Sequence, residues 1–143
     1  MGWAGILVPE AHGGAASGLA ALAGVLEQDG RTLAASPLIA TALIGATTLA
    51  HAGGSLRETL SGRLAHGACL LALALEKGPR HAPYAVATRA EWGGDGFVIN
   101  GRKTFVMDGH VADHFVVVAR TSGGSDERGG PPRALRGAAR AVT

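Results

Sequence analysis

The chain has 143 residues and a formal net charge of only +2, with 13 Lys and Arg against 11 Asp and Glu. This length suits one domain, or two small subdomains that share a core. The sequence has no basic stripe with interleaved aromatic residues, which argues against nucleic acid as a partner. Its one cysteine, Cys69, excludes an internal disulfide and lies in an apolar run, so we expect a buried, inert thiol.

An uncharged stretch from Thr32 to Leu56 raises the question of a membrane span. Pro37, Gly45 and several threonines dilute its apolar character, and Ala and Gly contribute little energy to insertion. The N-terminus shows no basic segment followed by an apolar core and a cleavage site, as a secretory signal would. We therefore expect a buried helix here, no membrane partner and a cytoplasmic protein.

Three helices are predicted in the first half, after a Gly- and Pro-interrupted extended segment at 2–14. Ser17 is expected to cap a helix that Gly30 closes. Ser36, followed by Pro37, begins a second helix. Apolar residues wrap most of the second helix, so it should be the most buried of the three; they are Leu38, Ile39, Leu43, Ile44 and Leu49. Ser55, with Glu58 three residues later, is typical of a capping box that starts the third.

The second half is rich in short β-like runs. They are 68–75, 84–88, 97–100, 104–107 and 115–119. Glycines at 93–96 and the pair Asn100-Gly101 have the composition of tight hairpin turns. Helices first and antiparallel strands second is an α+β order, without the alternation of a parallel sheet. From Ser122 the pattern fades, and we expect 129–143 to be an irregular tail.

Common catalytic and metal motifs do not explain this sequence. His110 and His114 have the spacing that holds zinc on a helix, but their flanks are β-like, and Val111 stands where a general-base glutamate would be. We expect no metal site. The sequence also has no serine framed as G-x-S-x-G and no glycine fingerprint followed by Lys-Ser or Lys-Thr. A serine hydrolase, a P-loop and a pyridine-nucleotide site are therefore disfavoured.

The most informative stretch is GDGFVINGRKTFVMDG at 94–109, which continues as VADHFVVVART at 111–121. It resembles the middle β-domain of acyl-CoA dehydrogenases, with the pattern G-x-G-(F/Y)-V-(L/I)-N-G-x-K-x-(W/F)-I-T-N-G. An independent element, GWAGILVPEAHGG at 2–14, is similar to the family's G-(W/L)-x-G-(I/L)-x-x-P-E-x-x-G-G. EQDGR at 27–31 resembles the E-x-x-G-R that closes its next helix. The resemblance covers residues 2 to about 128, in the family's order.

The resemblance implies a domain plan and a reaction. It divides the chain into an N-terminal helical region (1–66), part of a middle β-domain (67–128) and the irregular tail (129–143). The expected fold is α+β, with helices followed by part of an antiparallel β-barrel or sheet domain, truncated. The family's reaction is FAD-dependent α,β-dehydrogenation of acyl-CoA thioesters. A glutamate from a C-terminal helical bundle acts as base while FAD accepts the hydride. No residue of this chain is expected to be catalytic.

The resemblance also implies which residues face the flavin. The family segment (Y/C)-x-V-T-E-P matches 72–77, and W-I-T matches 105–107. The implied cofactor-binding residues are Leu73, Leu75, Glu76, Phe105, Val106 and Met107. Leu75 and Met107 stand where threonines donate hydrogen bonds to the flavin, and Phe105 keeps an aromatic ring for stacking. Periodicity alone interprets Phe105 and Met107 as ordinary sheet core.

Two function classes follow from these observations. The leading hypothesis is a fragment of an acyl-CoA dehydrogenase-like flavoprotein that is inactive alone, with an acyl-CoA substrate implied by the resemblance. The alternative is a non-enzymatic helix-plus-sheet protein that acts through protein contacts. In either case, apolar faces left without cover should favour self-association.

Overall fold

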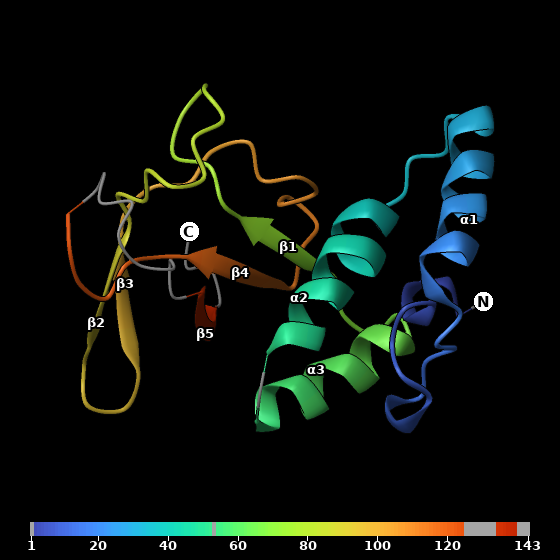
Figure 1. Ribbon diagram of the computed structural model, residues 1–143, viewed down its shortest axis with the longest axis horizontal. Coiled ribbons are helices and arrows are strands. Elements are labelled where there is room, and N and C mark those ends of the chain that lie inside the picture. Colours follow the sequence, from blue (N-terminus) through green and yellow to red (C-terminus); the bar gives the residue numbers. More distant parts are fainter. Residues whose placement is uncertain (1, 53, 125–133, 140–143) are drawn as a thin grey trace.

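The computed structural model describes residues 2–52 and 54–124, and the backbone of 134–139 (Figure 1). Helices gather at one end of the molecule and strands at the other. The helical elements are η1 (Trp3–Gly5), η2 (Glu10–His12), α1 (Gly18–Thr32), the π-helix η3 (Ile39–Gly45), α2 (Ala46–His51) and α3 (Ser55–Ala65). The strands are β1 (Leu71–Ala74), β2 (Arg89–Trp92), β3 (Phe97–Asn100), β4 (His114–Val118) and β5 (Ala134–Ala139).

The strands form two small sheets. One has the order β1-β4-β5, and the other is the β2–β3 hairpin. The α+β class is confirmed, but the expectation of purely antiparallel strands is wrong. β1 pairs with β4 in parallel, from Leu71 opposite His114 to Ala74 opposite Val117, and only β5 is antiparallel to β4. Parallel pairing requires a long crossover, and residues 75–113 supply it. The described strands do not close into a barrel.

The predicted strands agree with the structure only in part. The strand at 97–100 is confirmed as β3, and the runs at 68–75 and 115–119 contain most of β1 and β4. The strands predicted at 84–88 and 104–107 are wrong, because both segments are irregular. Phe105 and Asp108 adopt left-handed backbone angles (φ 51° and 53°), which interrupt any extended run.

The expected irregular tail is partly contradicted. Residues 134–139 form β5, which pairs with the free edge of β4. An edge strand can pair with another strand through main-chain hydrogen bonds alone, whatever the side chains of the second strand are. The sequence of β5 therefore shows no alternation of apolar and polar residues by which the strand could have been predicted. Residues 125–133 and 140–143 lie outside the described part of the chain.

Helix ends differ from the predicted caps. α1 continues past Gly30 to Thr32, where Leu33 takes the left-handed C-cap conformation (φ 50°). Ser17 does not cap α1, because its Oγ donates to the carbonyl of Ala15. The Ser36 hydroxyl instead donates to Asp29 Oδ2 at 2.6 Å, joining the end of α1 to the start of the next helix. The segment predicted to be extended contains η1 and η2.

The helix formed by η3 and α2 is buried through its small residues. The large side chains expected to make it the most buried helix are half-buried, except Ile39, which is 43% exposed, and Leu49, which is buried. The fully buried positions of η3 are instead Ala40, Thr41, Ala42 and Gly45. Small side chains allow this face to approach the sheet closely, which the apolar pattern alone does not reveal.

Close contact between η3 and β1 depends on Thr41 and Gly45. Thr41 Oγ1 donates to the Leu71 carbonyl and accepts from the Leu71 N–H, each at 3.2 Å. A side chain on Gly45 would meet Leu71, because a Cβ there would lie 2.9 Å from the Leu71 Cβ. Among the described strands β1 lies at the edge of its sheet, so the hydroxyl satisfies main-chain groups that none of those strands reaches.

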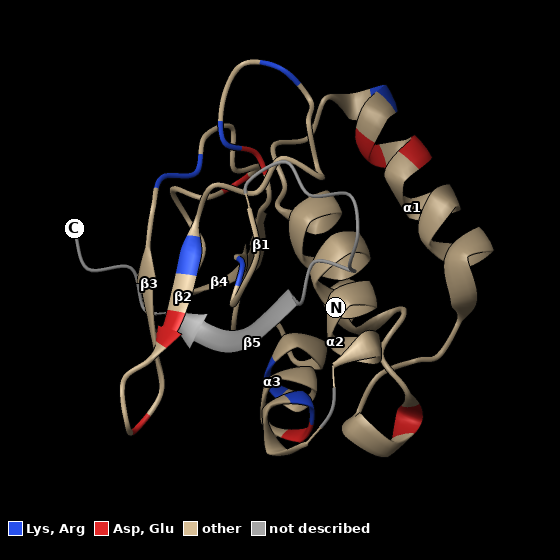
Figure 2. Cartoon of the chain, turned by 60° about the vertical axis from the view of Figure 1, so that its left-hand side comes forward, with Lys and Arg blue, Asp and Glu red and all other residues tan. Residues whose placement is uncertain are grey.

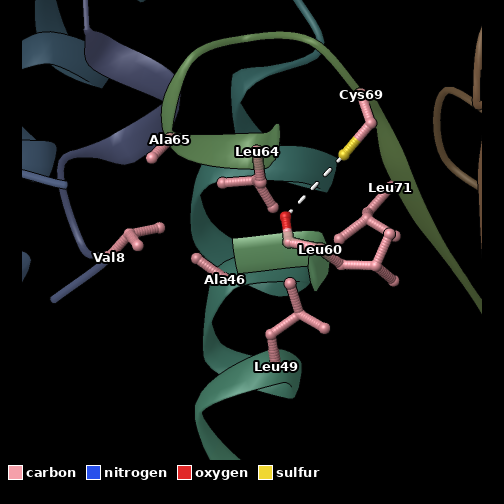
Figure 3. Packing of buried hydrophobic residues seen from close by; sticks show 8 residues of the cluster. All are labelled: Val8, Ala46, Leu49, Leu60, Leu64, Ala65, Cys69 and Leu71. Carbon is pink, nitrogen blue, oxygen red and sulfur yellow. Dashed lines mark hydrogen bonds between the residues drawn. The ribbon is translucent and has the colours of Figure 1, made fainter. Parts of the chain in front are cut away.

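An apolar cluster lies beneath this contact (Figure 3). It joins α2, α3, the N-terminal segment and the start of β1 through Val8, Ala46, Leu49, Leu60, Leu64, Ala65, Cys69 and Leu71. The prediction of a buried thiol is confirmed: Cys69 is 1% exposed, and its Sγ lies 4.0 Å from the Leu60 carbonyl. Burial raises the pKa of this thiol, which keeps it protonated and unreactive. Within the described residues no helix has both the length and the apolar character to cross a bilayer.

We predict that Thr41→Val destabilises the chain by about 2–3 kcal/mol, because the Leu71 N–H and carbonyl lose their buried partner while the volume is nearly unchanged. Thr47→Val, on the exposed side of α2, is the matched control and should cost less than about 0.5 kcal/mol. Urea unfolding followed by circular dichroism measures both. Equal stabilities of the two variants would contradict this account of the contact.

Candidate functional site

The two segments expected to face a flavin meet beyond the end of β1. The Lys103 Nζ donates to the Leu75 carbonyl at 2.8 Å, and the Thr104 N–H donates to the Glu76 carbonyl at 2.9 Å. The first predicted segment (72–77) is therefore joined directly to the residues that precede the second (105–107). These segments are about 30 positions apart in the sequence, and the parallel pairing of β1 with β4 brings the chain back past Leu75.

The second segment presents its side chains to solvent. Phe105 is 78% exposed and Met107 is 50% exposed, whereas Val106 is half-buried. Their interpretation as ordinary sheet core is therefore wrong for Phe105 and Met107. The left-handed backbone of Phe105 is uncommon for an aromatic residue and turns the chain out of a strand conformation. An exposed ring on a strained backbone next to Glu76 is a surface on which a flat ligand can stack.

The first segment is less exposed. Leu73 lies within β1 and is half-buried, as is Leu75 just beyond the strand. The Glu76 side chain is 18% exposed, and its Oε1 lies 2.5 Å from His81 Nδ1. Its Oε2 accepts from the Ala82 N–H at 3.3 Å. Glu76 thus folds the loop after β1 back on itself.

Opposing effects act on the pKa of Glu76. Desolvation raises it, but hydrogen bonds from Ala82 and His81 and the charges of His81 and Lys103 outweigh that effect, so the pKa lies below its ordinary value of 4.5. Burial lowers the pKa of Lys103, and the Glu76 charge opposes this. Glu76 is therefore ionised near neutral pH and is a weak proton acceptor. Figure 2 shows the basic positions of the loop after β1 in blue.

Two polar features of this site were missed in the sequence. His81 lies in a segment, 78–81, that departs from the family's G-S-D pattern, and its contact with Glu76 is seen only in the folded chain. Lys103 did carry a signal, because it occupies the lysine position of the G-x-K-x-(W/F) pattern. In addition, Thr104 Oγ1 is buried and has no hydrogen-bond partner among the described residues. The fold leaves this hydroxyl, next to Phe105, with unused hydrogen-bonding capacity.

The histidine pair predicted from the sequence lies on β4 and in the turn before it. His114 lies on β4, where its Nε2 is 3.3 Å from Arg63, and His110 lies in the preceding turn. In the part of the chain that the structure describes, no three His, Cys, Asp or Glu side chains gather closely enough to hold a metal ion.

No protein-family model matches the chain. Similarity to curated proteins is clear, however. The chain is 39% identical over 119 residues to the cyclohex-1-ene-1-carbonyl-CoA dehydrogenase of Geobacter metallireducens, a match that covers 80% of this chain and 31% of that protein. It is 31% identical over 124 residues to the 3-(aryl)acrylate reductase of Clostridium sporogenes, covering 84% of this chain and 33% of that protein.

Solved structures agree with the sequence matches. The Tcur3481-Tcur3483 steroid ACAD, in a variant form, superposes with a TM-score of 0.74 at 35% identity, covering 84% of this chain and 33% of that one. The ChsE4-ChsE5 complex from Mycobacterium tuberculosis gives a TM-score of 0.73 at 30% identity, covering 85% and 32%. Both are assemblies of more than one kind of chain by their names.

These matches place the chain in the class of oxidoreductases. More particularly, the chain belongs to the acyl-CoA dehydrogenase family. It spans about a third of the length of the curated relatives that it matches, 31% and 33% in the two cases above.

We predict a pH-dependent role for Glu76. Because its pKa is lowered on folding, the ionised carboxylate stabilises the chain above about pH 4.5, and this contribution is lost as the pH falls through the folded-state pKa. Glu76→Gln should therefore be less stable than the parent chain near neutral pH, and this difference should shrink as the pH falls below 4.5. Urea unfolding at several pH values measures the difference. A gap that persists unchanged at low pH would contradict the electrostatic role.

Proposed function

We propose that this chain forms the flavin-facing part of an acyl-CoA dehydrogenase-type flavoprotein. The observation that carries the proposal is the meeting of the two flavin-facing segments at Leu75–Glu76 and Lys103–Thr104, which leaves Phe105 exposed beside them. The division into a helical region (1–66) and a partial β-domain (67–128), which the whole protein would extend into a barrel, is part of the same proposal.

FAD is the cofactor that these residues fit. Phe105 and Met107 offer exposed, polarisable apolar surface for an isoalloxazine ring, and Leu73, Leu75 and Val106 offer half-buried apolar contact. When bound, FAD would supply the hydride-accepting chemistry for oxidation of an acyl-CoA thioester.

A proton acceptor for that reaction is not offered by the flavin-facing segment itself. Its carboxylate, Glu76, has a lowered pKa and is held by His81 and Ala82. A carboxylate tied in this way is poorly suited to take an α-proton, since general bases work best with a pKa near the operating pH. We therefore assign the base, and with it turnover, to the parts of the whole protein beyond the third that this chain spans.

The flavin proposal predicts that the chain binds FAD and that Phe105→Ala weakens binding by roughly 5–30-fold, corresponding to about 1–2 kcal/mol of lost stacking. Phe97→Ala, which removes a 44% exposed ring from β3, is the control and should leave the affinity unchanged. Quenching of FAD fluorescence on titration measures both. Parent chain that leaves FAD fluorescence unquenched would instead favour the non-enzymatic alternative.

Self-association is the second part of the proposal. The β2–β3 hairpin exposes Trp92 (65%) and Val98 (64%), and the Trp92 ring packs edge-to-face on Phe97 with centroids 5.3 Å apart. Exposed aromatic and aliphatic side chains on a two-stranded sheet are a typical contact surface.

Sedimentation velocity should therefore show a mass that rises with protein concentration. The Trp92→Ser/Val98→Ser double variant should shift this rise to higher concentration, because it removes apolar area without changing charge. A single monomeric species for the parent chain at every concentration would refute self-association.

A further inference from the structure

The joint between the two flavin-facing segments depends on two bonds from consecutive residues, Lys103 and Thr104. Neither side of this joint belongs to a strand, because β1 ends at Ala74 and residues 102–106 are irregular. The distance between Leu75 and Phe105 is therefore set by the bonds of the Lys103 ammonium and the Thr104 amide, and not by hydrogen bonds between paired strands.

The Lys103 ammonium loses part of its hydration when it makes this bond. Its side chain is withdrawn from water, and desolvation lowers its pKa, although the nearby Glu76 carboxylate opposes the shift. A lysine that donates to a main-chain carbonyl from a half-buried position gives up hydration that an exposed lysine keeps. Its charge is balanced by Glu76, whose own side chain continues the connection to His81 and to the Ala82 N–H.

These contacts form one continuous clip, defined by Lys103, Thr104, Leu75, Glu76 and His81. Two of its members, Leu75 and Glu76, are themselves flavin-facing residues, and Thr104 directly precedes Phe105. A change in the Lys103 bond would thus move the stacking ring relative to the half-buried apolar surface at Leu75. Positioned surfaces of this kind contribute to affinity mainly by reducing the ordering that binding would otherwise require.

We propose that Lys103 is a positioning residue for the flavin site: its Nζ bond to the Leu75 carbonyl sets the spacing between Leu75 and Phe105. This inference rests on the proposed function. Lys103 itself need not touch the cofactor. The Glu76 carboxylate acts with it by balancing the buried charge and by holding His81 against the same joint.

The test compares Lys103→Met and Lys103→Gln, which both remove the long, charged ammonium donor, with Lys103→Arg, which keeps a charged donor. Arg102→Met is the matched control, because it removes the neighbouring exposed cation. In the chain without flavin, amide hydrogen exchange by NMR should show Thr104 losing protection in the Met and Gln variants only. FAD titration should show affinity weakened at least about tenfold in those two variants, within roughly threefold of the parent for Lys103→Arg, and unchanged for Arg102→Met.

The two readouts separate the failure of this inference from failure of the proposed function. If the parent chain binds no FAD, the proposed function fails, and the exchange of Thr104 alone decides whether Lys103 holds the joint. If the Met and Gln variants bind FAD as tightly as the parent, the positioning role is overturned. Loss of cooperative unfolding in both variants would also overturn it, because Lys103 would then hold the fold as a whole.

Discussion

The structure depends on one buried hydroxyl. Thr41 Oγ1 both donates to and accepts from the main chain of Leu71, and it does so on the edge of β1 that faces away from β4 in the described sheet. The contact requires the small face of η3, because any side chain at Gly45 would collide with Leu71. An unsatisfied pair of main-chain groups at this depth would cost about as much as a large core deletion. Helices and strands, which lie at opposite ends of the molecule, are thereby fixed to each other.

The position of the candidate site depends on the direction of β1 beyond its contact with Thr41. The strand runs parallel to β4 and ends at Ala74, so Leu75 and Glu76 emerge at the strand end of the molecule and meet Lys103 and Thr104 there. Gly101 contributes at the other end of that segment: it packs against Thr88, where a Cβ would lie 2.7 Å from the hydroxyl. The position of Phe105 is thus set by contacts of the residues that directly precede it and owes little to its own side chain.

Local patterns predicted those parts of the molecule that local chemistry decides. The β3 strand, the glycine turn before it and the buried Cys69 all follow from neighbouring residues. The parallel partner of β1 could not be foreseen, because both strands are short apolar runs that suit either direction. Phe105 was misjudged by periodicity, which does not register its left-handed backbone or the contact that the preceding Thr104 makes with Glu76. The family motif predicted two flavin-facing segments, and the structure brings them side by side, but the motif did not predict the Lys103 contact that joins them or the His81 contact beside it.

The π-helix η3 continues without a break into the α-helix α2. Each π-turn holds about one residue more than an α-turn, so a π-helix behaves as an insertion of one residue into an otherwise regular helix. Excising a single residue from Ile39–Gly45 would let the segment relax to an α-helix with little change in the faces on either side. Excising one from residues 46–48 of α2 would instead rotate the residues before it by about 100° relative to those after it. Thr41 and Leu49 could then no longer face β1 and the core together. Residues 46–48 of α2 are accordingly less tolerant of deletion than the loop that precedes η3, whose length could change without rotating the helix.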